Sequence, residues 1–287
     1  MCFFPIRLLE TIEEMEQVEE LQRLVWPGSE TDVVPAHLLI TLAHNGGLVL
    51  GAYDGEKMVG LAFGFPGLYT VPDGPRPKHC SHELGVHPDY RNAGLGFALK
   101  RAQWQMVRQQ GLDRITWTYD PLLSPNAHLN IARLGTVCNT YLREVYGQMR
   151  DGLNAGLPSD RFQVDWWLNT RRVERRLGRQ SRPAAELAQY EAADIRALYP
   201  VTFSPAGWPQ PPADFTIPGE ALLLAEIPSD FMQLKADDFE LARAWRMFSR
   251  AIFEASFSAG YIVTDFIYDK TESRSLYVLT NGQSTLD

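Results

Sequence analysis

The stretch HPDYRNAGLG, residues 87–96, decides the fold class. It ends a run typical of a strand, CSHELGVH at 80–87, and leads into apolar positions that recur at helical spacing from Leu95 to Gly111. Glycines let a backbone approach an anion closely, and the N–H groups and dipole of a helix N-terminus favour negative charge. The stretch therefore predicts a phosphate-binding turn between a strand and a helix.

Two common phosphate-binding motifs fit this stretch poorly. The sequence contains no G-x-x-x-x-G-K-[ST] run of a P-loop. A dinucleotide fingerprint needs glycine or alanine where Leu99 stands, and a tight turn where residues 88–91 intervene. Asp113 does lie near the distance expected for a ribose contact, so the dinucleotide motif stays open as a minor alternative.

A third motif matches better. The pattern V-x-P-x-Y-R-x-x-G-x-G is formed by Val86, Pro88, Tyr90, Arg91, Gly94 and Gly96. It resembles the acyl-CoA pyrophosphate motif of the GNAT N-acyltransferase superfamily, in a branch with a long C-terminal extension. The resemblance covers roughly residues 5–168. It implies an α/β (α+β) fold, in which a mixed twisted sheet is flanked by helices and the strands CSHELGVH and RITWTYD splay apart to admit the acyl-CoA.

The rest of the chain reads as alternating strands and helices. A capping box at Thr11 and Glu14 predicts a helix start, and Asp54-Gly55 predicts a tight turn between two strands. The other expected elements are strands at 6–10, 48–53, 57–65, 114–121, 161–168, 221–227, 261–269 and 275–280, helices at 35–44, 126–145 and 237–259, and a proline-rich loop at 71–78.

Six arginines within residues 170–183 mark a shift in composition. We place a domain boundary there, which gives an acyl-CoA-binding GNAT domain at 1–169 and a C-terminal extension at 170–287. In the extension a helix is followed by a glycine and a tyrosine and then by two strands, and this order resembles that of residues 126–168. It is interpreted as a degenerate half-GNAT unit that completes the acceptor site, with shared packing but no common ancestry as the alternative. The arginines are expected on a solvated helix face, or as ligands of a CoA phosphate or an acidic substrate.

The resemblance implies acetyl-CoA or another acyl-CoA as co-substrate and assigns residues to its binding. Backbone amides along the glycine turn hold the pyrophosphate, an adjacent strand edge pairs with the pantetheine arm, and an asparagine before the next helix contacts that arm or caps the helix. The residues concerned are Leu84, Val86, Arg91, Asn92, Ala93, Gly94, Leu95, Gly96, Phe97, Asn126 and Asn130.

Transfer to an amine needs a base for the amine proton. Glu83 is the first candidate, because related enzymes place a base on this strand, and alternation puts it on the opposite face from His82. His82 and His87 are rivals, since histidine titrates near neutral pH. The group His79, His82, Glu83 and His87 does not predict a metal site, because alternation divides it between two faces.

The leaving thiolate needs an acid. Relatives use a tyrosine on the helix after the second splayed strand, and here Tyr141 or Tyr146 could serve, although the spacing departs from the family pattern. Cys138 is expected to be a buried thiol and not a nucleophile. Trp166, Trp167 and the late strand YIVTDFIY could line an acceptor pocket or fill the core.

The composition of the chain limits the classes of binding partner and the cellular location that we expect. The net charge of −8 argues against nucleic acid, and no run of about 18 apolar residues predicts a membrane span. Three scattered cysteines predict reduced thiols, and the acidic start lacks a basic targeting segment, so a cytoplasmic protein is expected. The sequence is compatible with a homodimer but does not predict one.

Together these features predict an acyl-CoA-dependent N-acyltransferase. It would transfer acetyl or succinyl by direct ternary-complex reaction to a small amine, with an amino acid favoured by the resemblance. The alternatives are a protein or peptide N-acetyltransferase and a non-catalytic acyl-CoA sensor.

Overall fold

The computed structural model describes residues 4–28, 30–148, 155–178 and 186–281 of the 287-residue chain. These residues form two compact units, and the chain passes from the first to the second between Trp117 and Thr118. The units therefore divide the chain earlier than the boundary expected near residue 169. The physical reason is that the strands at 137–142 and 161–167 pair with each other, and the first of them also pairs with a strand near the C-terminus.

The first unit is a sheet with helices on both faces. Neighbouring strands are antiparallel except for the last pair, β4 and β5, which is parallel. In order across the sheet they are β1 (Ile6–Leu8), β2 (Leu48–Asp54), β3 (Lys57–Val71), β4 (Gly74–Val86) and β5 (Arg114–Tyr119). The helical segments are α1 (Ile12–Val25), η1 (Glu30–Asp32), α2 (Ala36–His44), η2 (Pro88–Tyr90) and α3 (Leu95–Gln109).

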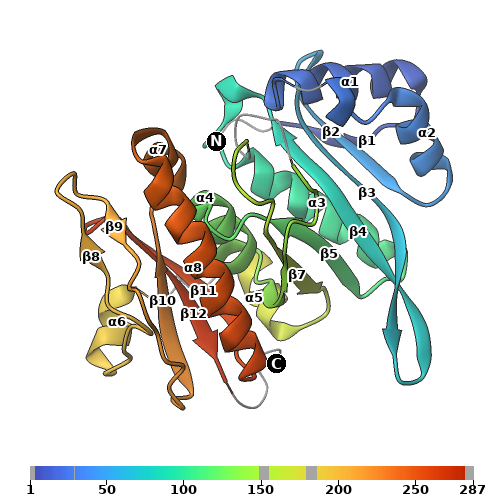
Figure 1. The fold of residues 1–287 in the computed structure, drawn as a ribbon. Helices are drawn as coiled ribbons and strands as arrows, with labels where there is room; N and C mark the ends of the chain where they lie inside the picture. Colours follow the sequence, from blue (N-terminus) through green and yellow to red (C-terminus); the bar gives the residue numbers. More distant parts are fainter. Residues whose placement is uncertain (1–3, 29, 149–154, 179–185, 282–287) are drawn as a thin grey trace. The chain divides into compact units, whose positions relative to one another are not determined.

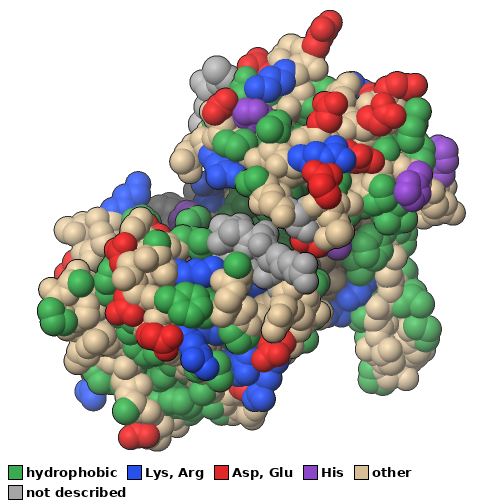
Figure 2. Space-filling model, turned by 45° about the horizontal axis from the view of Figure 1, so that its top comes forward, with side chains coloured by type: hydrophobic (Ala, Val, Ile, Leu, Met, Phe, Trp, Pro, Cys, Tyr) green, Lys and Arg blue, Asp and Glu red, His purple; other side chains and the backbone are tan. Residues whose placement is uncertain are grey.

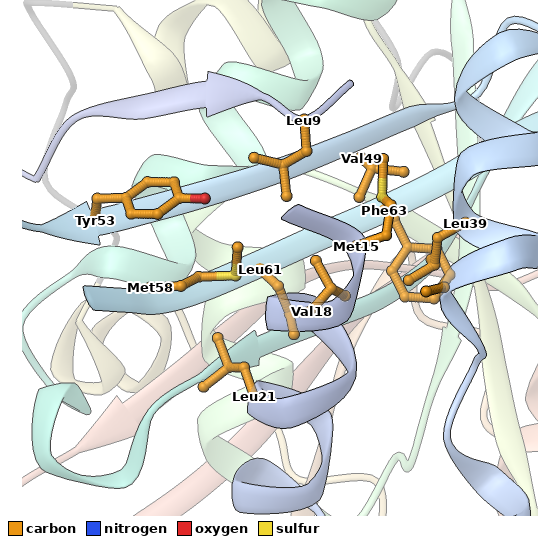
Figure 3. Packing of buried hydrophobic residues seen from close by; sticks show 11 residues of the cluster. Leu9, Met15, Val18, Leu21, Leu39, Val49, Tyr53, Met58, Leu61 and Phe63 are labelled. Carbon is orange, nitrogen blue, oxygen red and sulfur yellow. The ribbon is translucent and has the colours of Figure 1, made fainter. Parts of the chain in front are cut away.

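Two apolar clusters hold these layers together. On one face, Met15 and Val18 of α1 and Leu39 of α2 pack with β2 and β3 residues, as Figure 3 shows. On the other face, Leu95 and Leu99 of α3 pack against the same strands. Burying such side chains contributes roughly 1.5–3 kcal/mol each, so this packing fixes α3 against the sheet.

The helix starts and the first hairpin were predicted correctly. The Thr11 side chain accepts a hydrogen bond from the Glu14 amide, and the Glu14 side chain accepts from the Thr11 amide, which completes the capping box. The β2–β3 ladder turns between Asp54 and Lys57. α3 begins one residue after Gly94, where the glycine turn ends.

The loop prediction at 71–78 was wrong. β3 continues to Val71 and β4 starts at Gly74, so the two strands form one long hairpin arm. Pro75 and Pro77 are tolerated there because β4 pairs with β5 only from His79 onward. Before that point β4 is an edge strand, where proline is tolerated because an N–H that points away from β3 has no ladder partner.

The second unit is an antiparallel sheet packed against helix α8 (Phe239–Ser258). In order its strands are β7 (Arg161–Trp167), β6 (Val137–Leu142), β11 (Ile262–Asp269), β12 (Arg274–Thr280) and β10 (Leu222–Ile227). Its other elements are α4 (Ser124–Ala127), the π-helical turn η3 (His128–Arg133), α5 (Arg171–Leu177), α6 (Leu187–Ala192), β8 (Thr202–Phe203), β9 (Pro209–Gln210) and α7 (Phe231–Asp237). Figure 1 shows α8 running along the strands β10 to β12.

An aromatic cluster forms the centre of this unit. The ring of Phe162 on β7 lies 4.7 Å from that of Phe253 on α8 and 5.5 Å from that of Tyr277 on β12. Edge-to-face contacts of this kind add to the burial energy of large rings. Residues 91 and 115 positions apart in sequence are thereby held in contact.

The helix predicted at 126–145 is wrong over its second half. The helical segment ends at Arg133, and β6 occupies 137–142. Gly135 has a φ of +77°, which stops the helix, and Val137 and Cys138 then pair with β7. Tyr141 is therefore a strand residue and not a helix residue.

No helix in the described part of the chain combines the length and apolar character needed to cross a bilayer. On the face drawn in Figure 2, acidic and basic side chains are interspersed among hydrophobic and other residues.

Candidate active site

The glycine turn leaves the start of α3 open to an anion. Residues 91–94 are exposed, Asn92 and Gly94 have φ values of +64° and +80°, and Gly94 is an N-cap without a capping side chain. First-turn N–H groups have no intrahelical acceptor, so an uncapped N-terminus suits a phosphate. A Cβ on Gly94 would meet nothing within 4 Å, so the space beside it is free of the described residues.

The strand that leads into this turn separates from its neighbour. β4 and β5 are paired at His79–Ile115 and Cys80–Thr116, and the described residues show no further pairs between the two strands. On its other edge β4 stays paired with β3, where Leu84 faces Ala62 and Val86 faces Gly60. The β5-side edge of β4 beyond Cys80 is thus available for an added strand-like ligand.

A β-bulge lies at this separation. Glu83 pairs with Phe63, and Ser81 pairs with Gly64, so His82 is the extra residue. The His82 ring lies 5.4 Å from that of Phe63, the ladder partner of Glu83. The side chains of His82 and Glu83 therefore lie on the same face of the sheet. The prediction that they lie on opposite faces was wrong, because the bulge breaks the alternation.

Glu83 has a strongly perturbed carboxyl group. Burial, together with the nearby negative charge of Asp32, raises its pKa from 4.5 to about 8. Its Oε2 atom is buried and finds no hydrogen-bond partner among the residues that the structure describes. A carboxyl group with a pKa near 8 exchanges protons in the physiological range.

The rival histidines differ from Glu83 in environment. His82 is partly exposed to solvent, and partial burial lowers its pKa. The His87 Nδ1 atom accepts a hydrogen bond from the Asp89 amide at 3.3 Å, which engages it in the turn. Among the described residues, no group of three or more His, Cys, Asp or Glu side chains is arranged to hold a metal ion.

A buried polar group on the α3 side of β4 was not predicted. The Lys100 ammonium donates to Ser81 Oγ at 2.7 Å and Gln103 Oε1 at 3.1 Å, and the Gln103 amide contacts His79 Nε2 at 3.2 Å. Burial lowers the pKa of Lys100 well below 10.5 and that of His79 to about 3. The available signal was polar residues at positions 100 and 103 within the apolar stripe of the helix.

The two candidate acids lie in different settings, both in the second unit. The Tyr141 hydroxyl donates to Asp160 Oδ2 at 2.9 Å, and burial raises the tyrosine pKa. Tyr146 is exposed, and its hydroxyl lies 2.6 Å from Thr118 Oγ1 near the end of β5. Tyr146 is thus the more accessible hydroxyl.

The asparagines do not cap the helix. Asn126 lies inside α4 and is exposed, whereas Asn130 is buried in the π-helical turn. The backbone oxygen of Asn130 accepts from the Thr136 amide and hydroxyl. Asn126 is therefore the one of the two whose side chain is open to a ligand.

Two arginines of the run stabilise the second unit through hydrogen bonds. Arg172 donates to the backbone oxygens of Gly135 and Thr264, and Arg176 donates to Ala132 O and Asp265. Burial lowers the pKa of Arg172 to about 10. The expected solvated face applies to Arg171 and Arg175, which are exposed, while residues 179–183 lie outside the described part.

Other candidates belong to the core. Trp166 is fully buried and donates to Leu134 O at 2.8 Å. Cys138 is buried, and burial raises its thiol pKa, so the thiolate form is disfavoured.

Comparison with known proteins identifies the domain that contains the glycine turn. The model of the acetyltransferase (GNAT) family matches residues 12–130. Residues 12–130 are a GNAT acetyltransferase domain. The domain that contains the glycine turn therefore belongs to a family of acyltransferases, and enzymes of this family use acetyl-CoA.

Solved structures of GNAT enzymes resemble parts of the chain. The ribosomal-protein-S18-alanine N-acetyltransferase from Escherichia coli is 17% identical, with a TM-score of 0.43 over 58% of this chain and 94% of that one. Aminoglycoside 6'-acetyltransferase type Ii is 18% identical, with a TM-score of 0.45 over 58% and 99%. A GNAT acetyltransferase from Streptococcus pneumoniae is 17% identical, with a TM-score of 0.44 over 57% and 98%. No curated protein is similar enough in sequence to count as a match.

Proposed function

We propose that this GNAT enzyme transfers an acetyl or succinyl group from CoA to the amine of a small molecule, with an amino acid as the favoured acceptor. The observation that carries the proposal is Glu83, whose carboxyl group has a pKa of about 8. It lies where β4 leaves β5, on the strand that leads into the uncapped α3. A base is thus available beside the backbone features that suit a CoA thioester.

The residues present fit coenzyme A. The amides of residues 91–96, with Phe97 following, would hold the pyrophosphate at the α3 N-terminus. The free edge at Leu84 and Val86 would pair with the pantetheine arm, and Asn126 would contact that arm. When bound, the thioester supplies an activated acyl carbon and a thiolate leaving group.

The proposed reaction is direct transfer. Glu83 in its carboxylate form takes a proton from the acceptor ammonium, and the neutral nitrogen then forms a bond to the acyl carbon. The C–S bond breaks, and the sulfur takes a proton from Tyr146 or from water. The second proton of the new amide nitrogen passes to the tyrosinate or hydroxide that this leaves, so the protons balance. The exposure of Tyr146 supports it over Tyr141, whose hydroxyl proton is engaged by Asp160. A covalent acyl-cysteine at Cys138 is not required, and its raised thiol pKa disfavours one.

We assign acceptor recognition to the extension at 170–287. Its order β10, α8, β11, β12, with β12 between β11 and β10, supports a degenerate half-GNAT unit. The sequence of residues 170–281 contains no second R-x-x-G-x-G motif, so we do not propose a second CoA site there.

The test is free-thiol release with acetyl-CoA and succinyl-CoA against D- and L-amino acids, polyamines and a lysine peptide. Release with amino acids supports the proposal. Release with the peptide alone would assign a protein N-acetyltransferase. Tight CoA binding by calorimetry without release in any arm would favour a sensor and contradict the proposal.

A further inference from the structure

A buried arginine in the second unit has donors without acceptors. Arg246 on α8 is 1% exposed, and its Nη2 atom donates to Asp120 Oδ2. Its Nε and Nη1 atoms are buried and find no hydrogen-bond partner among the residues that the structure describes. A guanidinium carries five N–H donors, and leaving buried ones unpaired is costly. Such an arginine is suited to an acceptor that the described residues do not provide.

The surroundings of Arg246 favour a singly charged ligand. The Asp120 carboxylate also accepts from the Leu122 amide at 2.9 Å, and Arg161 Nη1 lies 3.8 Å from its Oδ2 atom. A phosphate dianion would be repelled by the adjacent Asp120 carboxylate. A carboxylate brings one negative charge and two acceptor oxygens, which suits a guanidinium.

A second carboxylate near Arg246, that of Asp160, already accepts hydrogen bonds from other donors. Asp160 accepts from Arg250 Nε and Nη2, both at 2.8 Å, and from the Tyr141 hydroxyl and the Glu144 amide. Asp160 is therefore committed to these donors and is not the missing acceptor of Arg246. The Phe231 ring lies 5.5 Å from the Arg246 guanidinium and supplies an apolar wall.

We infer that Arg246 binds the carboxylate of a substrate. This deepens the proposed function, on which it rests, by naming the substrate class. The carboxylate has two sources in that reaction, the α-carboxylate of an amino acid acceptor and the distal carboxylate of a succinyl group. Asp120 positions the guanidinium through Nη2 and leaves Nε and Nη1 for the ligand.

The test variant is Arg246→Lys, which keeps the charge and the bond to Asp120 within reach but removes the planar donor set. The matched control is Arg274→Lys, because Arg274 also pairs with a buried carboxylate, Glu226, at 2.8 Å. Acyl transfer is measured for phenylalanine and phenethylamine, each with acetyl-CoA and succinyl-CoA. The two amines differ only in the carboxylate.

If the carboxylate comes from the acceptor, Arg246→Lys raises the KM for phenylalanine by about tenfold, and the KM for phenethylamine stays within about twofold. If it comes from the acyl group, the KM for succinyl-CoA rises, and that for acetyl-CoA does not. An equal change for all four pairs, no change in any, or the same pattern in Arg274→Lys overturns the inference.

Equilibrium titration separates this inference from the proposed function. Phenylalanine and succinate are titrated into wild type and Arg246→Lys in the presence of CoA, and heat is measured without turnover. Weaker binding of either probe to the variant supports the carboxylate site even if no amine is acylated. Equal affinity of both proteins for both probes, or no binding to either, contradicts it.

Discussion

The Lys100 ammonium lies 3.7 Å from the centroid of the Trp117 ring, which joins the middle of α3 to β5. The ring face and Ser81 Oγ partly offset the cost of burying a charge, yet burial still lowers the pKa of Lys100 well below 10.5. At pH values between this lowered pKa and 10.5, the folded state therefore binds fewer protons than the unfolded state.

Replacing this lysine tests the buried charge. Stability rises with pH where the unfolded state binds more protons, so Lys100 lowers stability as the pH falls below 10.5. We expect Lys100→Met to weaken that dependence, measured as unfolding free energy in urea from pH 6 to 10. Lys57→Met, at an exposed lysine, is the control. An identical pH dependence in Lys100→Met and wild type would show that Lys100 is not buried.

For Glu83 we expect the opposite dependence of the unfolding free energy on pH. Its folded pKa of about 8 lies above the ordinary 4.5, so the folded state binds more protons between these values. Stability contributed by the protonated form is present below pH 4.5 and is lost as the pH rises through 8. We expect Glu83→Gln to be more stable than wild type at pH 8.5, by on the order of 3 kcal/mol, with a smaller difference at pH 5. The same measurement on the exposed Glu56→Gln should give no such trend.

Gly94 and Gly111 form a matched pair for testing the CoA site. Both have a φ of +80°, and a Cβ on either meets nothing within 4 Å. Alanine should therefore cost each a similar 1–2 kcal/mol, by rough estimate, from the left-handed backbone. Only Gly94→Ala should weaken CoA binding, by about tenfold or more in calorimetry, because its methyl group would stand where we propose that the pyrophosphate binds. Equal CoA affinity in the two variants would remove the turn as the pyrophosphate site.

Cys138 is expected to be chemically silent. Its thiol is buried and has a raised pKa, whereas Cys80 is only half-buried. A maleimide should label Cys80 before Cys138 in the native protein, as read by mass spectrometry of peptides. Cys138→Ala should keep turnover within about twofold while lowering stability by about 1–2 kcal/mol. Loss of turnover in a folded Cys138→Ala variant would indicate a covalent intermediate.

Local patterns in the sequence predicted the parts of the fold that local physics controls. The capping box at Thr11, the turn at Asp54-Gly55 and the glycine turn before α3 all depend on residues within a few positions of one another. β6 was missed because the segment 126–145 has helical apolar spacing, while its strand half is selected by ladders to β7 and β11.

Candidate functional residues could be proposed from the sequence only where one strand carries them. Glu83 follows from its place before the glycine turn, but the bulge at His82 depends on the register with β3 and is not visible in the sequence. The pairing of Arg246 with Asp120 joins residues 126 positions apart. No local spacing indicates such a contact.

The pH dependence of acyl transfer by Glu83→Gln tests the central claim most directly. For wild type, kcat/KM with the best amine should rise with pH through an apparent pKa near 8, because the carboxylate form accepts the proton. Glu83→Gln should lose this rise and fall about a hundredfold in rate at pH 8.5, while CoA affinity and the rate of Glu56→Gln stay at the wild-type level. A Glu83→Gln variant that keeps both the rate and the rise near pH 8 would contradict the account.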